Sequence, residues 1–213
     1  MNDPENPPDE HNLKPTRRKA DRPDEIVQAA MEVFLQVGFA RAKVTDIARK
    51  AGAAKGTVYL YFTTKDHLFE AVVRRFIGPM LNQMDAYVSN FKGTSRELLS
   101  GAILICYEQL ADNPTRRAIL RIMISEGHRF PGLVEIYHRD VVSAALNTMR
   151  RIIDRGVRSG EFRPTAAKDF PQVIVGPVMM SAIWKLTFDN IAPIDISKVA
   201  ESHLDLLFEG LLA

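Results

Sequence analysis

Residues 44–62 read VTDIARKAGAAKGTVYLYF, and this stretch predicts two short helices joined by a tight turn. Gly52 can adopt the left-handed conformation that a residue with a Cβ avoids, so the chain can turn sharply there. The apolar residues on either side of the turn can pack inward against a preceding helix; they are Ile47, Ala48, Ala51, Val58 and Phe62. The spacing therefore predicts helices over about 44–51 and 55–62 in a helix-turn-helix arrangement.

The second predicted helix would expose an unusual set of residues, namely Lys55, Gly56, Thr57, Tyr59 and Tyr61. Such a set is odd for a face in water, but it suits a helix that lies in the major groove of DNA. There Lys and Thr can reach base edges, Tyr hydroxyls can reach phosphates, and a glycine lets the backbone come close. We interpret these residues, together with Thr45 of the first helix, as candidate DNA contacts.

Charge is distributed unevenly along the chain, although the net charge of the whole is only +2. Residues 14–65 contain 11 Lys and Arg against 5 Asp and Glu, whereas residues 76–213 contain 15 of each kind. An excess of positive charge confined to the helix-turn-helix end favours a polyanionic partner. A solvated basic surface would give the same counts, so charge alone does not decide between the two.

Helical periodicity covers nearly all of the chain from residue 24 onward, and no segment alternates as a strand would. The apolar stripe from Ile26 to Val37 predicts a helix that ends at Gly38. Thr64 is the expected N-cap of a longer helix, which Gly78 and Pro79 should kink or divide.

The chain as a whole is predicted to have an all-α fold in two folded parts. Residues 1–20 are rich in Pro, Asp, Glu and Asn and are expected to form a disordered arm. A helix-turn-helix domain is predicted over residues 21–66, and a helical ligand-binding and dimerisation domain over residues 67–213.

Several classes of protein are disfavoured by the sequence. A single cysteine, Cys106, gives no disulfide framework and no cysteine cluster for zinc, and it favours a reducing, cytoplasmic setting. The histidines are scattered, and neither a nucleophile elbow nor a glycine-rich phosphate loop is present, so we expect no catalytic site, metal or cofactor. The longest apolar stretch, residues 173–186, is short for a membrane span, and the N-terminus does not read as a secretory signal.

The helix-turn-helix segment resembles the tetracycline-repressor-type (TetR) family of bacterial regulators. The matching residues are Ile47-Ala48, Ala51-Gly52, Lys55-Gly56-Thr57-Val58-Tyr59, Tyr61-Phe62 and Lys65. The resemblance, detailed over about residues 24–75, implies a homodimeric repressor on a near-palindromic operator of double-stranded DNA. It also implies release from DNA by a small apolar or amphipathic effector, and it makes Lys65 a candidate phosphate contact. Residues 125–131, SEGHRFP, look like part of a sensor domain found in many members, including regulators of efflux.

Two residues depart from the family pattern at the helix starts. Lys43 and Ala54 stand where the family usually has a Thr or Ser that caps the next helix. Such a hydroxyl accepts a backbone N–H group that has no partner within the helix. Asp46 keeps the N3 half of a capping box, and Lys43 can replace a hydroxyl–phosphate contact with a contact between charges.

A ligand pocket lies among the C-terminal helices in the family that the chain resembles. Met and aromatic side chains often line adaptable apolar pockets, and the candidates here are Tyr107, Met123, Tyr137, Met180 and Trp184. Glu126 and His128 are candidates for polar anchors of a ligand, or they cap a helix or face solvent. The alternative is that the Met and aromatic residues are ordinary core.

The last two predicted helices, about 169–188 and 197–211, are more apolar than a helix pair needs against its own core. We expect a four-helix dimer interface, two helices from each subunit, as the resemblance also implies. Its candidate residues are Val175, Met179, Ala182, Leu204, Leu207, Phe208 and Leu211. The alternative is a helix pair that is buried within a monomer.

Three other functions stay open on the sequence alone. A DNA-binding regulator of the same fold can act with a protein partner instead of a small molecule, and a sensor domain without a cavity would support that reading. A transcriptional activator instead of a repressor is also compatible with the residues. A helical enzyme is disfavoured because no catalytic constellation is present.

Overall fold

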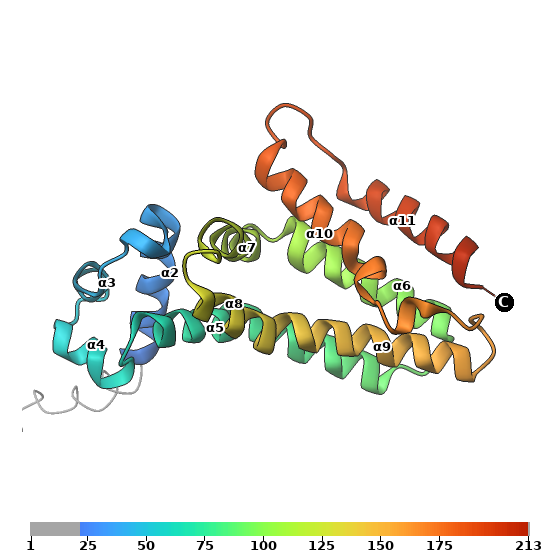
Figure 1. The fold of residues 1–213 in the computed structure, drawn as a ribbon, viewed down its shortest axis with the longest axis horizontal. Helices are drawn as coiled ribbons and strands as arrows, with labels where there is room; N and C mark the ends of the chain where they lie inside the picture. The colour runs from blue at the N-terminus through green and yellow to red at the C-terminus, as the bar shows by residue number, and fades with distance from the viewer. Residues whose placement is uncertain (1–21, 213) are drawn as a thin grey trace, which may run out of the picture.

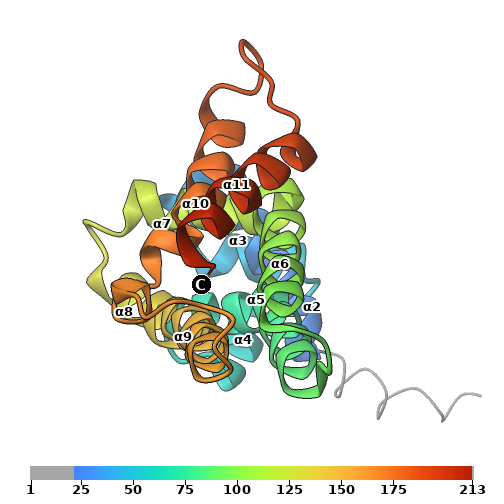
Figure 2. The ribbon, with the colours of Figure 1, turned by 90° about the vertical axis from the view of Figure 1, so that its right-hand side faces the viewer.

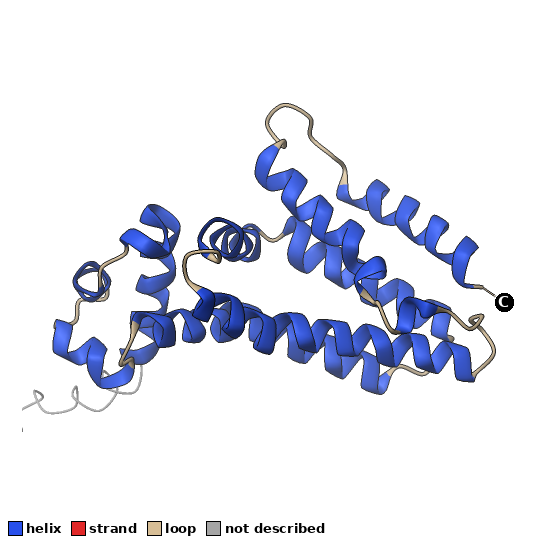
Figure 3. Ribbon diagram, viewed as in Figure 1, coloured by secondary structure: helices blue, strands red, loops and turns tan. Residues whose placement is uncertain are grey.

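The computed structural model describes residues 22–212, and every regular element in that range is helical (Figure 3). Within it, strand-like pairing is confined to an isolated bridge between Phe162 and Leu212. The predicted all-α fold is therefore confirmed. The disordered arm predicted over residues 1–20 lies outside the described residues.

Three helices form the N-terminal end of the described chain (Figure 1). They are α2 (Arg22–Arg41), α3 (Val44–Lys50) and α4 (Lys55–Tyr61). Gly52, in the turn between α3 and α4, has a φ of 60°, the left-handed conformation that the sequence predicts. Gly38 has a φ of 78° and breaks the helical backbone where the sequence predicts an end, but helical structure resumes and continues to Arg41.

The long helix α5 (Lys65–Asn90) leads from these three helices into the rest of the molecule (Figure 1). The Thr64 hydroxyl accepts a hydrogen bond from the backbone N–H of His67 at 3.1 Å, so the predicted N-cap is confirmed. Pro79 lies inside α5, yet the helix is not divided. Pro79 has no N–H to donate, so the helix lacks one internal hydrogen bond there without ending.

The remaining elements follow α5 in the chain. They are α6 (Ser95–Cys106), the π-helical η1 (Tyr107–Asp112), α7 (Pro114–Glu126), α8 (Pro131–Tyr137), the π-helical η2 (His138–Val142), α9 (Ser143–Arg158), the 3₁₀ turn η3 (Ala166–Lys168), α10 (Gln172–Thr187) and α11 (Ile196–Leu211). Helices α6, α7, α8 and α9 and the segment η2 pack along α5, and α10 and α11 pack on these elements in turn. Figures 1 and 2 both show α10 and α11 side by side on one flank of the molecule.

Two hydrophobic cores hold the helices together, and the first one joins the two predicted domains. It combines Ile26, Phe34 and Val58 of the N-terminal helices with Ile119 and Leu133 of α7 and α8. The second core lies among α5, α6, α9, α10 and α11. Helix α2 is therefore packed directly against α7, in addition to being connected to it through α5.

Candidate nucleic-acid interface and apolar cavity

Helix α4 presents the face that the sequence assigns to DNA. Val58 is fully buried and holds the helix against the first core. Around the rest of the helix Lys55, Gly56, Tyr59 and Tyr61 are exposed, while Thr57 is half-buried. The Lys55 ammonium lies 5.8 Å from the centre of the Tyr59 ring, which places a cation and an aromatic ring together on the outer surface.

Leu60 is also exposed on α4, and its apolar side chain did not mark it as a candidate DNA contact in the sequence. Its side chain is 82% exposed, although it is apolar and lies between two tyrosines. An exposed leucine on a helix of this kind can contact the C5-methyl group of thymine in a major groove. Its position in the sequence between Tyr59 and Tyr61, on the exposed side of α4, could have identified it as a candidate DNA contact.

The start of α3 carries the other exposed candidates, Lys43 and Thr45. Lys43 occupies the N-cap position without a side-chain hydrogen bond, and Ala54 does the same for α4, so both predicted capping defects are present. The Asp46 carboxylate pairs with Arg49. Asp46 therefore does not complete the capping box that the sequence suggested.

Lys65 requires a correction, because its ammonium group is occupied within the protein. The Nζ donates hydrogen bonds to the carbonyl oxygens of Phe39 at 2.7 Å and of Ala40 and Ala42 at 3.3 Å each. It also lies 4.4 Å from the centre of the Phe39 ring. Burial lowers the pKa of Lys65, an effect opposed by Asp66 and Glu126. An ammonium has three N–H groups, and here three carbonyls of the α2 end satisfy them.

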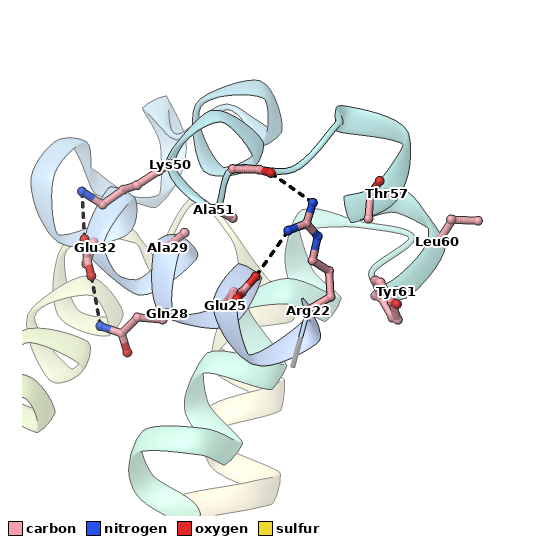
Figure 4. A pocket seen from close by; sticks show the side chains of 11 residues that line it. Arg22, Glu25, Gln28, Ala29, Glu32, Lys50, Ala51, Thr57, Leu60 and Tyr61 are labelled. Carbon is pink, nitrogen blue, oxygen red and sulfur yellow. Dashed lines mark hydrogen bonds and ion pairs between the residues drawn. The ribbon is translucent and has the colours of Figure 1, made fainter. Parts of the chain in front are cut away.

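An open cleft of about 860 Å³ lies between α2 and the two helices of the helix-turn-helix (Figure 4). Its charged side chains are engaged with other groups of the protein. Arg22 donates to the Gly52 carbonyl at 3.0 Å and contacts Glu25, and Lys50 pairs with Glu32 at 2.8 Å. These contacts brace the start of α2 against the turn that positions α4, so we interpret the cleft as structural.

A small cavity of about 120 Å³ lies in the C-terminal region, at the meeting point of α5, α7 and α10. Its lining is almost entirely apolar and comprises Ile77, Met80, Cys106, Leu110, Arg116, Tyr137, Val141, Val142, Ala145, Leu146, Val175, Val178 and Met179. A second cavity of about 440 Å³ shares Met80, Cys106, Ala145 and Val175 with the first. The larger volume alone is within the range of about 300–1,000 Å³ that small-molecule sites occupy.

Of the five residues predicted to line a pocket, Tyr137 lines this cavity and the other four lie elsewhere. Tyr107 is buried and its hydroxyl is bonded to His203 Nδ1 at 3.2 Å. Met123 packs against the first core, and Met180 is 53% exposed. The Trp184 indole N–H donates to the Ala192 carbonyl at 2.6 Å, in the connection between α10 and α11.

The predicted dimer residues also divide into groups. Val175 and Met179 line the cavities, while Leu204 and Leu207 are half-buried against the second core. Ala182, Phe208 and Leu211 are already buried within the subunit, so a partner cannot bury them further. The prediction that Ala182, Phe208 and Leu211 form the dimer interface is therefore wrong. The apolar residues that α10 and α11 leave exposed are Val173, Met180 and Leu206.

Neither a membrane nor a metal is indicated by the described part of the chain. No helix between residues 22 and 212 is long and apolar enough to cross a bilayer. No group of three His, Cys, Asp or Glu side chains in the same range is placed to hold a metal ion.

Comparison with known proteins gives consistent matches over nearly the whole chain. The profile of bacterial regulatory proteins of the tetR family matches residues 26–72, and that of a tetracyclin repressor-like C-terminal domain matches residues 99–191. The fatty acid metabolism regulator protein of Bacillus subtilis is 25% identical over 191 residues, which cover 88% of this chain and 94% of that protein. The transcriptional repressor KstR2 of Mycolicibacterium smegmatis is 25% identical over 197 residues, covering 90% of this chain and 91% of the repressor.

A solved structure extends the similarity to three dimensions. The regulator FadR from Bacillus subtilis, crystallised in complex with stearoyl-CoA, superposes with a TM-score of 0.72 at 25% identity. The match covers 88% of this chain and 98% of that structure, so both the N-terminal and the C-terminal helices are included.

Proposed function

Because the chain belongs to the TetR family of bacterial regulatory proteins, which are DNA-binding transcription regulators and not enzymes, we propose how its own residues perform that role. The protein acts as a homodimeric repressor in the cytoplasm. It binds a near-palindromic operator through α4, and a small molecule with an apolar body releases it by entering the cavity beside α5. The observation that carries the proposal is the pairing of an exposed recognition surface with a partly open apolar cavity along one continuous helix.

The DNA contacts proposed for α4 follow from the chemistry of its exposed face. Lys55 and Thr57 reach base edges, Tyr59 and Tyr61 reach phosphates, and Gly56 lets the backbone approach. Leu60 adds an apolar contact to a thymine methyl group. Lys43 and Thr45, which are exposed at the start of α3, are the proposed contacts to the sugar-phosphate backbone.

Dimerisation uses the outer face of α10 and α11. Val173 and Met180 are seven residues apart, which is about two helical turns, so they lie on the same side of α10. Leu206 of the neighbouring α11 is 70% exposed and is the third apolar side chain of the proposed interface. A two-fold axis through the face would place two α4 helices in successive major grooves, about 34–36 Å apart.

The cavity supports a small-molecule effector over a protein partner, since a small apolar hollow between several helices suits a ligand of limited size. Among the relatives, FadR of Bacillus subtilis binds stearoyl-CoA, a molecule with a long apolar chain. We therefore expect the effector of this chain to have an extended apolar part that occupies the two adjoining cavities.

Helix α5 is the proposed link between effector and DNA. Ile77 and Met80 of α5 line the smaller cavity, and Lys65 at its start binds the carbonyl groups at the end of α2. A ligand that displaces the middle of α5 would move Lys65 and with it the helix-turn-helix. A coupling of about 1–3 kcal/mol between the two sites is enough for a switch.

The test of the proposed function is a footprint on the DNA immediately upstream of the protein's own gene. We expect protection of a near-palindromic site by the wild type and its loss in Lys55→Ala and Tyr61→Phe, with Lys168→Ala as a surface control. Repeating the footprint with a panel of fatty acids, acyl-CoAs and steroids should reveal release. A protein that protects no site, or whose site survives both α4 variants, contradicts the proposal.

A further inference from the structure

The Thr148 hydroxyl has no hydrogen-bond partner in the part of the chain that the structure describes. Thr148 lies on α9, is only 8% exposed and lines the larger cavity. A Ser or Thr within a helix can donate its hydroxyl to the carbonyl four residues earlier. Ser181 of α10 does so, to the Pro177 carbonyl at 2.8 Å, whereas Thr148 makes no such bond.

This unbonded hydroxyl reaches open space. Across residues 22–212, every side-chain nitrogen or oxygen that is sealed from solvent has a hydrogen-bond partner, so the Thr148 oxygen is not sealed. The space beside it is the larger cavity, of about 440 Å³. A hydroxyl both donates and accepts, and leaving it unbonded in buried surroundings costs free energy. The fold therefore offers one neutral donor and acceptor to a molecule in this cavity.

The charges around the larger cavity balance each other. Asp85 and Arg151 are the charged residues of its described lining, and they pair with each other at 2.6 Å. The lining also contains the neutral amides of Asn82 and Asn147, both of which are exposed. The cavity therefore presents hydrogen-bonding groups without a net charge.

The adjoining smaller cavity adds no charge to the site, because its surface is almost wholly apolar. Arg116 belongs to its lining, but the guanidinium donates to the carbonyls of Phe76 at 3.1 Å and Gln109 at 3.3 Å. Cys106 lines both cavities, and burial raises the pKa of its thiol to about 12, so the thiol is uncharged at neutral pH. A charged group of a ligand would lose its water here without gaining an unpaired counter-ion, which is unfavourable.

We propose that the two cavities form the site of a neutral amphiphile, an uncharged molecule whose hydroxyl or carbonyl group binds the Thr148 hydroxyl. This inference rests on the proposed function, which it deepens by naming the chemical class of the effector. The Thr148 hydroxyl donates to a carbonyl oxygen or accepts from an alcohol, so it recognises both groups. The apolar body passes Met80 and Val175, which line both cavities, and its end occupies the smaller cavity of about 120 Å³.

Isothermal titration of the full-length protein at neutral pH tests the proposal with four probes: 1-decanol, 2-decanone, decanoic acid and decanoyl-CoA. The wild type should bind the alcohol and the ketone at least about tenfold more tightly than either anionic probe, because only the neutral groups enter without an unpaired charge. This comparison does not depend on any variant. The alcohol and the ketone together show whether Thr148 recognises a hydroxyl, a carbonyl or both.

Thr148→Val keeps the shape of the side chain and removes its hydroxyl. It should weaken the binding of both neutral probes by about three- to tenfold, the usual effect of one neutral hydrogen bond. Thr148→Ser keeps the hydroxyl and should retain most of the affinity. Thr187→Val is the matched control, because Thr187 is exposed at the end of α10 and lines neither cavity. It should bind all four probes as the wild type does.

Three results would each overturn the proposal. The first is decanoate or decanoyl-CoA binding to the wild type as tightly as 1-decanol or more tightly. The second is unchanged binding of both neutral probes by a folded Thr148→Val, with folding checked by circular dichroism. The third is the absence of binding of either neutral probe up to its solubility limit.

The same probes separate this inference from the proposed function. If decanoyl-CoA releases the operator while Thr148→Val changes no affinity, the inference fails and the repressor function stands. If 1-decanol binds through Thr148 without changing the affinity for the operator, the site stands and release by this ligand fails.

Discussion

Ala54→Ser tests whether the recognition helix α4 is held as loosely as its N-cap suggests. Ala54 has φ of −72° and ψ of 148°, the extended conformation in which a Ser side chain can accept a hydrogen bond from the first helical turn. The Ala54 carbonyl already accepts the N–H groups of Thr57 at 2.9 Å and Val58 at 3.3 Å. The N–H of Gly56 has no partner among the described residues, so a Ser hydroxyl at position 54 is expected to bind it.

The expected gain from this cap is about 1 kcal/mol, the typical difference between Ser and Ala at an N-cap. That free energy corresponds to about fivefold slower hydrogen exchange at Gly56 if its amide opens with α4 alone. It corresponds to a rise of about 2–4 °C in Tm if α4 unfolds with the whole protein.

Hydrogen exchange of the wild type, Ala54→Ser and Ala53→Ser measures the effect directly. Ala53 is the matched control because it lies one residue outside the N-cap, and its own N–H is already bonded to the Ala48 carbonyl at 2.9 Å. Exchange at Gly56 and Thr57 should slow in Ala54→Ser and stay at the wild-type rate in Ala53→Ser. Unchanged exchange and Tm in Ala54→Ser would refute the argument, since another group would then already satisfy the helix start.

Four further predictions follow from the described contacts. Lys65→Met should lower the free energy of unfolding by about 1–3 kcal/mol in urea titrations, because three carbonyls lose their donor. A variant of unchanged stability whose DNA binding depends less on salt would instead support a contact between Lys65 and a DNA phosphate. Met180→Glu and Leu206→Glu should sediment as monomers, whereas exposed Ile124→Glu on α7 should remain dimeric; intact dimers in the first two variants would move the interface elsewhere. Leu60→Ala should weaken binding to a thymine-containing operator by about 1 kcal/mol and leave binding to the same operator with uracil unchanged, and equal losses on both would exclude a methyl contact. Burial raises the pKa of Cys106 to about 12, so its alkylation by iodoacetamide should keep accelerating above pH 9 in the folded protein; a plateau near pH 9 would show an open, solvated thiol.

The helix-turn-helix was predictable because local rules determine it. The turn needs a residue that tolerates positive φ at position 52, and the buried positions 47, 48 and 58 follow from helical spacing. The two missing caps were also visible in the sequence, because capping depends on a single side chain next to each helix start. None of these features requires knowledge of distant contacts.

The ligand and dimer residues were harder to predict because they depend on helix rotation. On α10, Val175 and Met179 turn toward the cavities, while Val173 and Met180 turn outward, although all four are apolar and close in sequence. Composition marks such a helix as apolar on most sides but does not say which side meets the subunit's own core. The packing of α10 against its neighbours decides that.

Lys65 and Arg116 show the same limit for charged residues. Both look like surface cations in the sequence, and both reach partners that are far away along the chain. Lys65 bonds to carbonyls 23–26 positions earlier, and Arg116 bonds to the carbonyl of Phe76, 40 positions earlier. The pattern of a single helix contains no information about such contacts.

The most direct test of the central claim, that an occupied cavity and a bound operator oppose each other, is fluorescence anisotropy of labelled operator DNA. The footprinted upstream site would be titrated with protein in the presence and absence of saturating 1-decanol or decanoyl-CoA. The comparison variant is Ala145→Phe, because Ala145 lines both cavities and a larger side chain there fills them. We predict that the compound that binds the wild-type cavity weakens operator binding by at least about fivefold, and that it has no such effect on Ala145→Phe. An operator affinity that is the same with the cavity empty and with it occupied would contradict the account.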